Sequence, residues 1–256
     1  MLSATRHAEI LRRLRSHGEV SVQALADDLA VSPSTIRRDL DALDAEGRLR
    51  RVRGGGGGSV EPDATPFREV ARQAPDAKDA VAARAASLVA DGDVVVVDIG
   101  TTTERLAHHL AGRRITVVTA SLAVVDVLRE DADVELVVLG GVLRRSYWSL
   151  VGTLTEQAVG QLGAHVCFLG TSGVREDGTV MDSTGIEVPV KRALAAASRR
   201  TVLLADGGKF PGTGLLPVCG PETVDVLVTD AGADPATLGV FRDGGAQVLM
   251  AEEGDA

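Results

Sequence analysis

The chain has 256 residues, 45% of them hydrophobic, and it holds no run of about 18 apolar residues, which excludes a disordered chain and a membrane-spanning helix. Its formal net charge is −9, yet residues 1–60 carry ten arginines against eight acidic residues, so the acidic excess lies in the remainder. This distribution suits a cytoplasmic protein that contacts nucleic acid through a weakly basic N-terminal domain and has an acidic second domain.

Two short helices are expected at the start of the chain. Over residues 3–17 the apolar side chains share one helical face, and Arg6 lies outside it, where it contacts either a phosphate or solvent. Ser21 is suited to cap a second helix over residues 23–29. The turn at residues 30–32 is short, so the second helix is expected to pack closely against the helix that follows.

The next helix is expected over residues 32–46. Ser32 is a good N-cap, Pro33 fits the first turn, and Gly47 supplies a stop at the C-terminal end. The apolar positions of this helix recur at helical spacing and form one narrow stripe, which consists of Ile36, Leu40 and Leu43. This stripe is expected to face the core, so the rest of the helix surface is left for a partner.

The outer face of this helix carries hydroxyls and two arginines. Arginine recognises guanine edges or phosphates, and Ser and Thr hydroxyls bind phosphates or bases. A solvated arginine face is the alternative, but two helices joined by a tight turn, the second of them basic, form a helix-turn-helix. The predicted contacts of this helix with operator DNA are Ser32, Ser34, Thr35, Arg37 and Arg38.

A short hairpin, or wing, is expected after this helix. Residues 49–53 alternate apolar and basic side chains and run into the glycines 54–58, which form the wing tip. Arginines at this place are able to lie along a phosphate backbone. The predicted wing contacts are Arg50, Arg51 and Arg53.

A linker is expected after the wing, because three prolines follow the glycines between residues 59 and 75. Within it, residues 67–70 are expected to lie against the second domain, since Phe is scarce in this chain. The predicted organisation is a winged helix-turn-helix over residues 1–58, a linker over 59–75 and a second domain over 76–256.

This N-terminal segment resembles the DeoR family of bacterial transcriptional regulators. The resemblance rests on Leu25-Ala26, on the run VSPSTIRRDL over residues 31–40, and on Gly47, Arg51 and the glycines that follow. In this family a winged helix-turn-helix precedes a C-terminal sensor of sugar phosphates. One departure is Arg53, where the family often has His.

From residue 76 apolar strands alternate with helices, which is typical of an α/β fold with a largely parallel sheet covered on both faces. Ligands of such sheets bind beyond the carboxyl ends of the strands. The expected strands are residues 94–98, 115–119, 134–139, 166–170, 201–205, 224–229 and 247–250. The expected helices are residues 77–90, 103–111, 122–130, 154–162, 187–198 and 235–240.

The loops after the first three strands carry small and hydroxylic residues. In the first loop, Asp98 precedes a turn with one glycine and three threonines, which either cradles an anion or is an ordinary N-cap; these residues are Gly100, Thr101, Thr102 and Thr103. The second loop adds hydroxyls at Thr119 and Ser121, and the third permits close backbone approach at Gly140 and Gly141. We expect these loops to converge on one ligand.

Lysine is rare here, since only three of the 27 basic residues are lysine. Lys209 follows a strand in the segment Asp206-Gly207-Gly208-Lys209, and an ammonium at that place suits a phosphate or carbonyl oxygen. Lys191 lies one turn after Glu187, so these two residues form either part of the site or a surface ion pair.

These segments are similar to the DeoR sensor domain, whose fold is related to ribose-5-phosphate isomerase. The resemblance implies that the domain binds a phosphorylated sugar effector that alters operator affinity, and that the chain is a repressor and not an enzyme. Ala120 stands where the family commonly has Asn. The predicted effector-binding residues are Asp98, Gly100, Thr101, Thr102, Thr103, Thr119, Ala120, Ser121, Gly140, Gly141, Asp182, Glu187, Lys191, Asp206 and Lys209.

Several alternatives stay open. One alternative is a sugar-phosphate isomerase with a DNA-binding appendage. Another is an adaptor whose winged helix binds protein. Asp182 either binds sugar hydroxyls or is a turn residue, and residues 144–148 either close over the ligand or contact another subunit of a homodimer or homotetramer. No cofactor or metal is expected, since Cys167 and Cys219 lie in apolar segments without ligand spacing.

Overall fold

The computed structural model describes residues 5–7, 9–10, 13, 19–45, 49–52, 55–57, 66–212 and 214–252. The chain divides into two compact units, Met1–Ala64 and Thr65–Ala256, which are described separately below. Among the described residues, every helix is too short or too polar to cross a bilayer.

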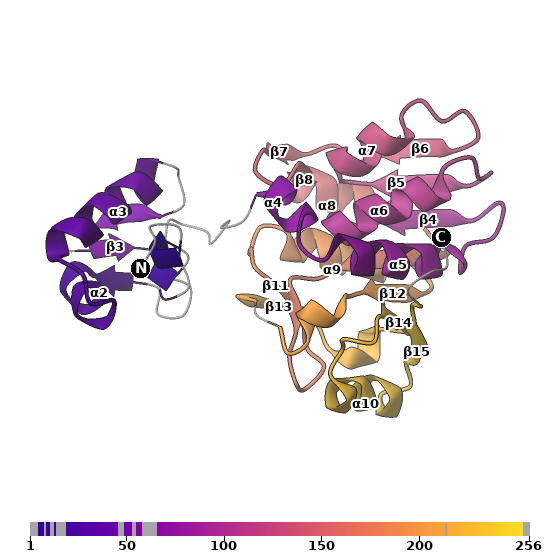
Figure 1. Ribbon diagram of the computed structural model, residues 1–256. Coiled ribbons are helices and arrows are strands. Elements are labelled where there is room, and N and C mark those ends of the chain that lie inside the picture. Colours follow the sequence, from indigo (N-terminus) through magenta and orange to yellow (C-terminus); the bar gives the residue numbers. More distant parts are fainter. Residues whose placement is uncertain are drawn as a thin grey trace. The chain divides into compact units, whose positions relative to one another are not determined.

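The first unit contains two capped helices, α2 (Val22–Asp28) and α3 (Pro33–Ala45) (Figure 1). The Ser21 hydroxyl accepts a hydrogen bond from the amide of Ala24 at 3.0 Å, as the sequence predicts. The Ser32 hydroxyl does the same for the amide of Thr35 at 3.1 Å. The predicted apolar stripe of α3 is confirmed, because Ile36, Leu40 and Leu43 are fully buried in the core of this unit.

A three-stranded antiparallel sheet accompanies these helices, in the order β1 (Glu19–Ser21), β3 (Gly55–Gly57) and β2 (Arg50–Val52). The expected hairpin is therefore present as β2 and β3. The glycine run is not only a wing tip, however, because β3 is the central strand. A Cβ at Gly55 would lie 2.0 Å from the carbonyl oxygen of Val20, so this close strand approach requires glycine. Gly47, Arg53, Gly54 and Gly58 lie outside the described residues.

The second unit is built on a seven-stranded sheet whose neighbouring strands are all parallel. Every strand that the sequence predicts is present in it, and the predicted α/β class is confirmed. In spatial order the strands are β15 (Gln247–Met250), β14 (Val226–Thr229), β12 (Thr201–Leu204), β9 (Val166–Gly170), β4 (Val94–Val97), β5 (Thr116–Thr119) and β6 (Glu135–Val138).

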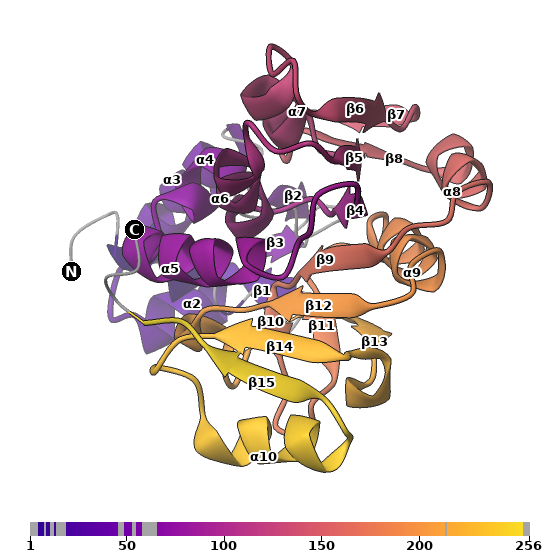
Figure 2. The ribbon, with the colours of Figure 1, turned by 90° about the vertical axis from the view of Figure 1, so that its right-hand side faces the viewer.

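Helices cover both faces of this sheet, and each face has its own apolar core (Figure 2). Alternate strand residues face opposite cores; Val95 and Val97 belong to one core and Val96 to the other. One face packs against α5 (Pro75–Ala86), α6 (Thr101–Leu110) and α7 (Leu122–Leu128). The other packs against α8 (Thr153–Val159), α9 (Val188–Ala196) and α10 (Pro235–Asp243).

Short elements between these strands are absent from the sequence prediction. They are a hairpin of β7 (Val142–Arg144) and β8 (Ser149–Val151), and a small sheet of β10 (Gly173–Val174), β11 (Val180–Asp182) and β13 (Leu216–Cys219). These strands lack the longer continuous apolar runs that indicated the strands of the seven-stranded sheet. Part of the expected linker is also helical, as α4 (Phe67–Ala71), because Phe67 is buried against the second unit's own aromatic residues.

The strand order has one reversal, between β4 and β9. From β4 the chain proceeds outward through β5 and β6, then returns to β9 on the other side of β4 and continues outward through β12, β14 and β15. Such a switch point leaves a crevice at the carboxyl ends of the two central strands, where open α/β sheets bind ligands.

Candidate DNA-binding surface and effector site

The outer face of α3 presents the predicted DNA contacts together. Arg37 and Arg38 are both exposed. The Ser32 hydroxyl lies 2.7 Å from the Ser34 hydroxyl and 2.8 Å from the Thr35 hydroxyl, so the three form one cluster at the N-terminal end of the helix. An exposed helix N-terminus with hydroxyls and guanidinium groups is suited to phosphates and to base edges.

Arg6 has a different role from either one that the sequence suggested. Its guanidinium group donates to both carboxylate oxygens of Asp39, at 2.5 and 2.9 Å, and both residues are buried. The hydrogen bonds from Arg6 lower the pKa of Asp39. This bidentate ion pair fixes the first helical segment to α3, so Arg6 is neither solvated nor free for a phosphate.

The wing is described only through its backbone. Arg50 and Arg51 lie in β2, and Arg53 lies outside the described residues. Their contact with phosphates therefore stays a prediction.

In the second unit, Asp98 lies at the switch point of the sheet. It follows β4 and is fully buried, and its Oδ2 accepts hydrogen bonds from the Gly170 amide at 3.0 Å and from the Lys191 ammonium at 2.5 Å. Its Oδ1 is also buried but has no hydrogen-bond partner among the described residues. A buried acceptor without a donor is uncommon and indicates a place for a ligand or water.

Lys191 joins this carboxylate to a second one. Its ammonium also donates to the Gly170 carbonyl oxygen at 3.0 Å and lies 3.5 Å from Oδ2 of Asp182. Burial opposes the charge of Lys191, but Asp98, Asp182 and Glu187 together raise its pKa, so it stays protonated. Asp182 lies buried in β11, and its Oδ1 accepts hydrogen bonds from the Thr184 amide at 2.9 Å and from the Thr184 hydroxyl at 3.3 Å, so it also closes the turn that follows the strand.

Glu187 belongs to the same buried cluster. Its side chain accepts hydrogen bonds from the Ser149 hydroxyl at 2.6 Å and from the Thr184 hydroxyl at 3.2 Å, and it forms an ion pair with Arg144. Only 3% of Glu187 and 2% of Lys191 are exposed, so the alternative of a surface ion pair is wrong. Burial raises the pKa of Glu187, although Arg144 opposes this rise.

The anion cradle begins at Gly100, the N-cap of α6. Its φ of 151° is a conformation that side-chain-bearing residues rarely adopt. The Thr103 hydroxyl donates to the Gly100 carbonyl oxygen at 2.9 Å, and Thr101 and Thr102 are buried in the first turn. The ten-residue helix α6 therefore directs its N-terminal amides and threonines toward the carboxyl edge of the sheet.

The residues of the other two predicted loops make hydrogen bonds and packing contacts within the fold, and their contact with an effector stays a prediction. The Thr119 hydroxyl donates to the Val97 carbonyl oxygen at 2.7 Å and accepts from the Ser121 amide at 3.0 Å, and Ser121 caps α7. Ala120 is fully buried. Near the third loop, the Thr155 hydroxyl donates to the Gly140 carbonyl oxygen at 2.7 Å. A Cβ at Gly141 would lie 2.1 Å from that hydroxyl, so packing against α8 requires this glycine.

A second carboxylate and a second ammonium group follow the end of β12. Asp206 is buried, and its Oδ1 accepts from the Gly208 amide at 3.1 Å, whereas its Oδ2 has no partner among the described residues. Lys209 follows in the same turn and is partly exposed. Asp206 and Lys209 thus offer one buried acceptor and one accessible cation.

Lys78 is a functional candidate that the sequence analysis missed. It lies in the first turn of α5 and is 1% exposed, and its ammonium donates to the Val70 carbonyl oxygen at 2.6 Å. Burial and the neighbouring charge of Lys209 lower its pKa to about 8, and Asp206 opposes this shift. The rarity of lysine, which singled out Lys191 and Lys209, applied equally to Lys78. Arg144 and Ser149, which hold Glu187, were also missed.

Two family models match this chain. One, described as the DeoR-like helix-turn-helix domain, matches residues 6–57, and the other, the DeoR C terminal sensor domain, matches residues 73–231. The glycerol-3-phosphate regulon repressor of Escherichia coli K12 is 30% identical over 244 residues, which cover 95% of this chain and 97% of that protein. The transcriptional repressor GlcR of Bacillus subtilis is 27% identical over 256 residues, which cover 99% and 98%.

Among solved structures, ribose 5-phosphate isomerase A of Methanocaldococcus jannaschii aligns with a TM-score of 0.40 and 18% identity, over 53% of this chain and 54% of that one. Both of the relatives described above are named transcriptional repressors, which confirms the prediction of a transcriptional regulator. Because both of its units match the family's models and nearly its whole length matches these repressors, the chain belongs to the DeoR family of transcriptional repressors.

Proposed function

We propose that this repressor binds its operator through the outer face of α3 and through the wing, and that a phosphorylated sugar or polyol bound at the carboxyl edge of the sheet controls this binding. The observation that carries the proposal is Asp98 at the switch point, with one oxygen held by Lys191 and the other buried without a well-aligned hydrogen bond from any described residue. A ligand hydroxyl would supply that donor. The name of the Escherichia coli relative, a glycerol-3-phosphate regulon repressor, supports a phosphorylated ligand.

The two ends of such a ligand have separate places in this proposal. The phosphate lies with Lys78, Lys209 and the N-terminal turn of α6, where ammonium groups and free amides favour an anion. The hydroxyls lie with the acceptors Asp98, Asp182, Glu187 and Asp206. Lys191 and Arg144 already form ion pairs with Asp98 and Glu187, respectively. Lys78 and Lys209 are therefore the cations left for the phosphate.

The repressor acts in this proposal as a homodimer or homotetramer, since two helix-turn-helix units reach successive half-sites of an operator. An effector that prefers the arrangement unable to bind DNA, by about 1–3 kcal/mol, lowers operator affinity about 5–150-fold.

The test measures binding to the DNA upstream of the protein's own gene by fluorescence anisotropy. The effector panel is glycerol 3-phosphate, glucose 6-phosphate, fructose 1-phosphate and ribose 5-phosphate, with glycerol and glucose as unphosphorylated controls. We expect one phosphorylated member to release the DNA and the controls to leave it bound. DNA binding that no panel member changes would contradict the sensor half of the proposal.

The affinity for that panel member is expected to fall by up to about tenfold between pH 7 and pH 9. The pKa of Lys78 is lowered to about 8, so its ammonium is lost over this range in the free protein, and a phosphate is bound best by the protonated form. Isothermal titration calorimetry at both pH values measures the change. The Lys78→Met variant is the control and should bind the effector weakly, with little pH dependence. If its affinity falls as much as that of the wild type between pH 7 and pH 9, a group other than Lys78 causes the pH dependence.

A further inference from the structure

Four side chains fasten α4 to the loop between β7 and β8, and we call them the α4 clasp: Phe67, Arg68, Tyr147 and Trp148. Phe67 stacks on Trp148 with ring centroids 5.9 Å apart and planes 8° apart, and it meets the edge of Tyr147 at 5.5 Å. Arg68 lies 5.2 Å from the Trp148 ring centroid. The amide of Phe67 also donates to the Ser146 carbonyl oxygen at 3.1 Å. The chain's only Trp and only Tyr are thus both used to hold one five-residue helix.

The clasp continues directly into the hydroxyl end of the effector site. The Arg144 guanidinium carbon lies 5.0 Å from the Tyr147 ring centroid, and the same guanidinium group forms the ion pair with buried Glu187. A ligand hydroxyl that hydrogen-bonds to the Glu187 carboxylate and shifts it would therefore move Arg144. The Tyr147 ring, which contacts Phe67, would move with it. Side chains this closely packed transmit small shifts.

The other end of α4 is tied to the phosphate end of the site. The Val70 carbonyl oxygen accepts the hydrogen bond from the buried Lys78 ammonium at 2.6 Å. A phosphate bound to Lys78 would compete with this carbonyl or reorient it. One short helix is thus attached to both ends of the proposed ligand site.

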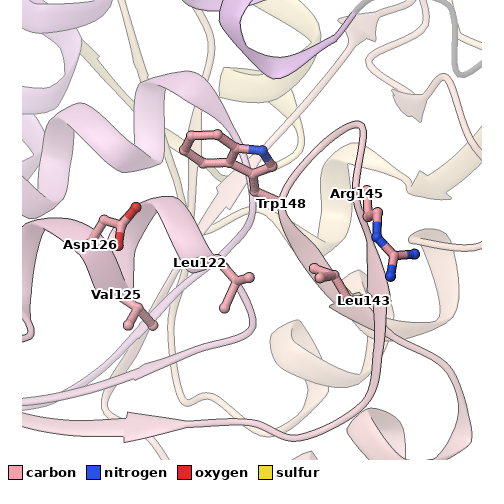
Figure 3. A pocket seen from close by; sticks show the side chains of 6 residues that line it. All are labelled: Leu122, Val125, Asp126, Leu143, Arg145 and Trp148. Atoms are coloured by element: carbon pink, nitrogen blue, oxygen red, sulfur yellow. The ribbon is translucent and has the colours of Figure 1, made fainter.

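The loop that holds α4 has a strained backbone at Trp148 and a pocket beside it. Trp148 has a φ of 55°, a left-handed backbone conformation that a bulky residue rarely adopts, and such strain is typical of switch segments. Its indole borders open space as well, because it lines a pocket of about 480 Å³ with Leu122, Val125, Asp126, Leu143 and Arg145 (Figure 3). The stacked ring therefore has room to shift.

We infer that α4 and its clasp form the element that transmits effector binding to the DNA-binding unit. In chain order α4 is the first described element of the second unit, and the segment before it leads to the wing. In this inference a displacement of α4 is passed along the covalent chain toward the first unit. This inference rests on the proposed function, because it assigns the route by which the same effector acts.

The single Trp gives a direct measurement in the full-length protein. Titration with the panel of phosphorylated compounds is followed by Trp148 emission and, in parallel, by release of operator DNA. We expect the panel member that releases DNA to change the emission with the same midpoint. Unchanged emission at a concentration that releases DNA would overturn the inference.

Two variants then separate transmission from binding. Phe67→Leu keeps an apolar side chain but removes both ring contacts, whereas Arg72→Ala changes an exposed residue at the end of the same helix and is the matched control. For Phe67→Leu we expect operator affinity without effector within about threefold of the wild type and effector affinity within about fivefold, but a fold-change on effector addition reduced toward one. Arg72→Ala should respond like the wild type.

A Phe67→Leu variant that releases DNA as fully as the wild type would overturn the inference while leaving the proposed function intact. Loss of effector binding in this variant would also overturn it, since Phe67 would then belong to the site. If the variant does not fold, Arg68→Ala, which loses only the exposed contact over Trp148, takes its place in the same assay. Wild-type DNA binding that no panel member changes overturns the proposed function, and this inference with it.

Discussion

Replacing Lys191 with methionine is expected to lower the free energy of unfolding of the second unit by about 3–5 kcal/mol, because it removes one partner of a buried ion pair. The Lys191 ammonium donates hydrogen bonds to Asp98 at 2.5 Å and to the Gly170 carbonyl oxygen at 3.0 Å, and it lies 3.5 Å from Asp182. Methionine replaces none of these contacts. Urea unfolding followed by circular dichroism measures the loss. The same variant should no longer respond to the effector.

The pH dependence of this variant has a definite sign. Burial already raises the pKa of Asp98, and loss of the ammonium that opposes this rise should raise it further. A carboxyl group whose pKa is higher in the folded state than in the unfolded state destabilises the fold once it must ionise. This loss of stability is absent below the unfolded-state pKa and grows as the pH rises toward the folded-state pKa. The Lys191→Met variant should therefore approach wild-type stability toward pH 4 and differ most at pH 7.

A double-mutant cycle supplies the control for this result. Adding Asp98→Asn to Lys191→Met removes the isolated charge, so the double variant should be more stable than Lys191→Met alone. If Lys191→Met unfolds at the same urea concentration as the wild type, the buried pair does not stabilise the unit. A double variant that is less stable than both single variants would contradict the pairing itself.

Replacing both Arg37 and Arg38 with alanine is expected to weaken operator binding by about 30-fold to 10⁴-fold, since each arginine contact with a base or phosphate contributes about 1–3 kcal/mol. Both side chains are exposed on α3, and the buried stripe that holds this helix is unchanged, so the unit should stay folded. Anisotropy titrations at several salt concentrations measure the loss. The slope of log affinity against log salt should fall by about one for each phosphate contact removed.

The matched control is Arg199→Ala with Arg200→Ala, an adjacent arginine pair in the second unit. It changes the net charge equally but should leave operator affinity within a few-fold. Equal losses in both double variants would show that net charge, and not α3, decides the affinity. An unchanged salt slope in the α3 variant would assign its arginines to base contacts alone.

The sequence determined those features that depend on neighbouring residues. Ser21 and Ser32 fixed the starts of the two helices of the first unit because a serine hydroxyl satisfies a nearby helix amide. Apolar runs such as 94–97 indicated the parallel strands, because the inner strands of such a sheet are buried on both faces and are continuously apolar. The short turn between the two helices of the first unit and the basic face of the second one indicated the helix-turn-helix. The loop after the first strand and the rarity of lysine led to the prediction that Asp98 and Lys191 belong to the effector site.

Only the tertiary structure decided which of those residues belong to one cluster. Lys191 reaches Asp98 across 93 positions of sequence, and Arg6 reaches Asp39 across 33. The partners of a buried charge are fixed by strand order and helix packing, which local patterns do not contain. For the same reason Lys78 was missed, since only burial distinguishes it from a surface lysine. Thr119 and Ser121 also satisfy backbone groups at the carboxyl ends of the strands, and their contact with a ligand stays a prediction.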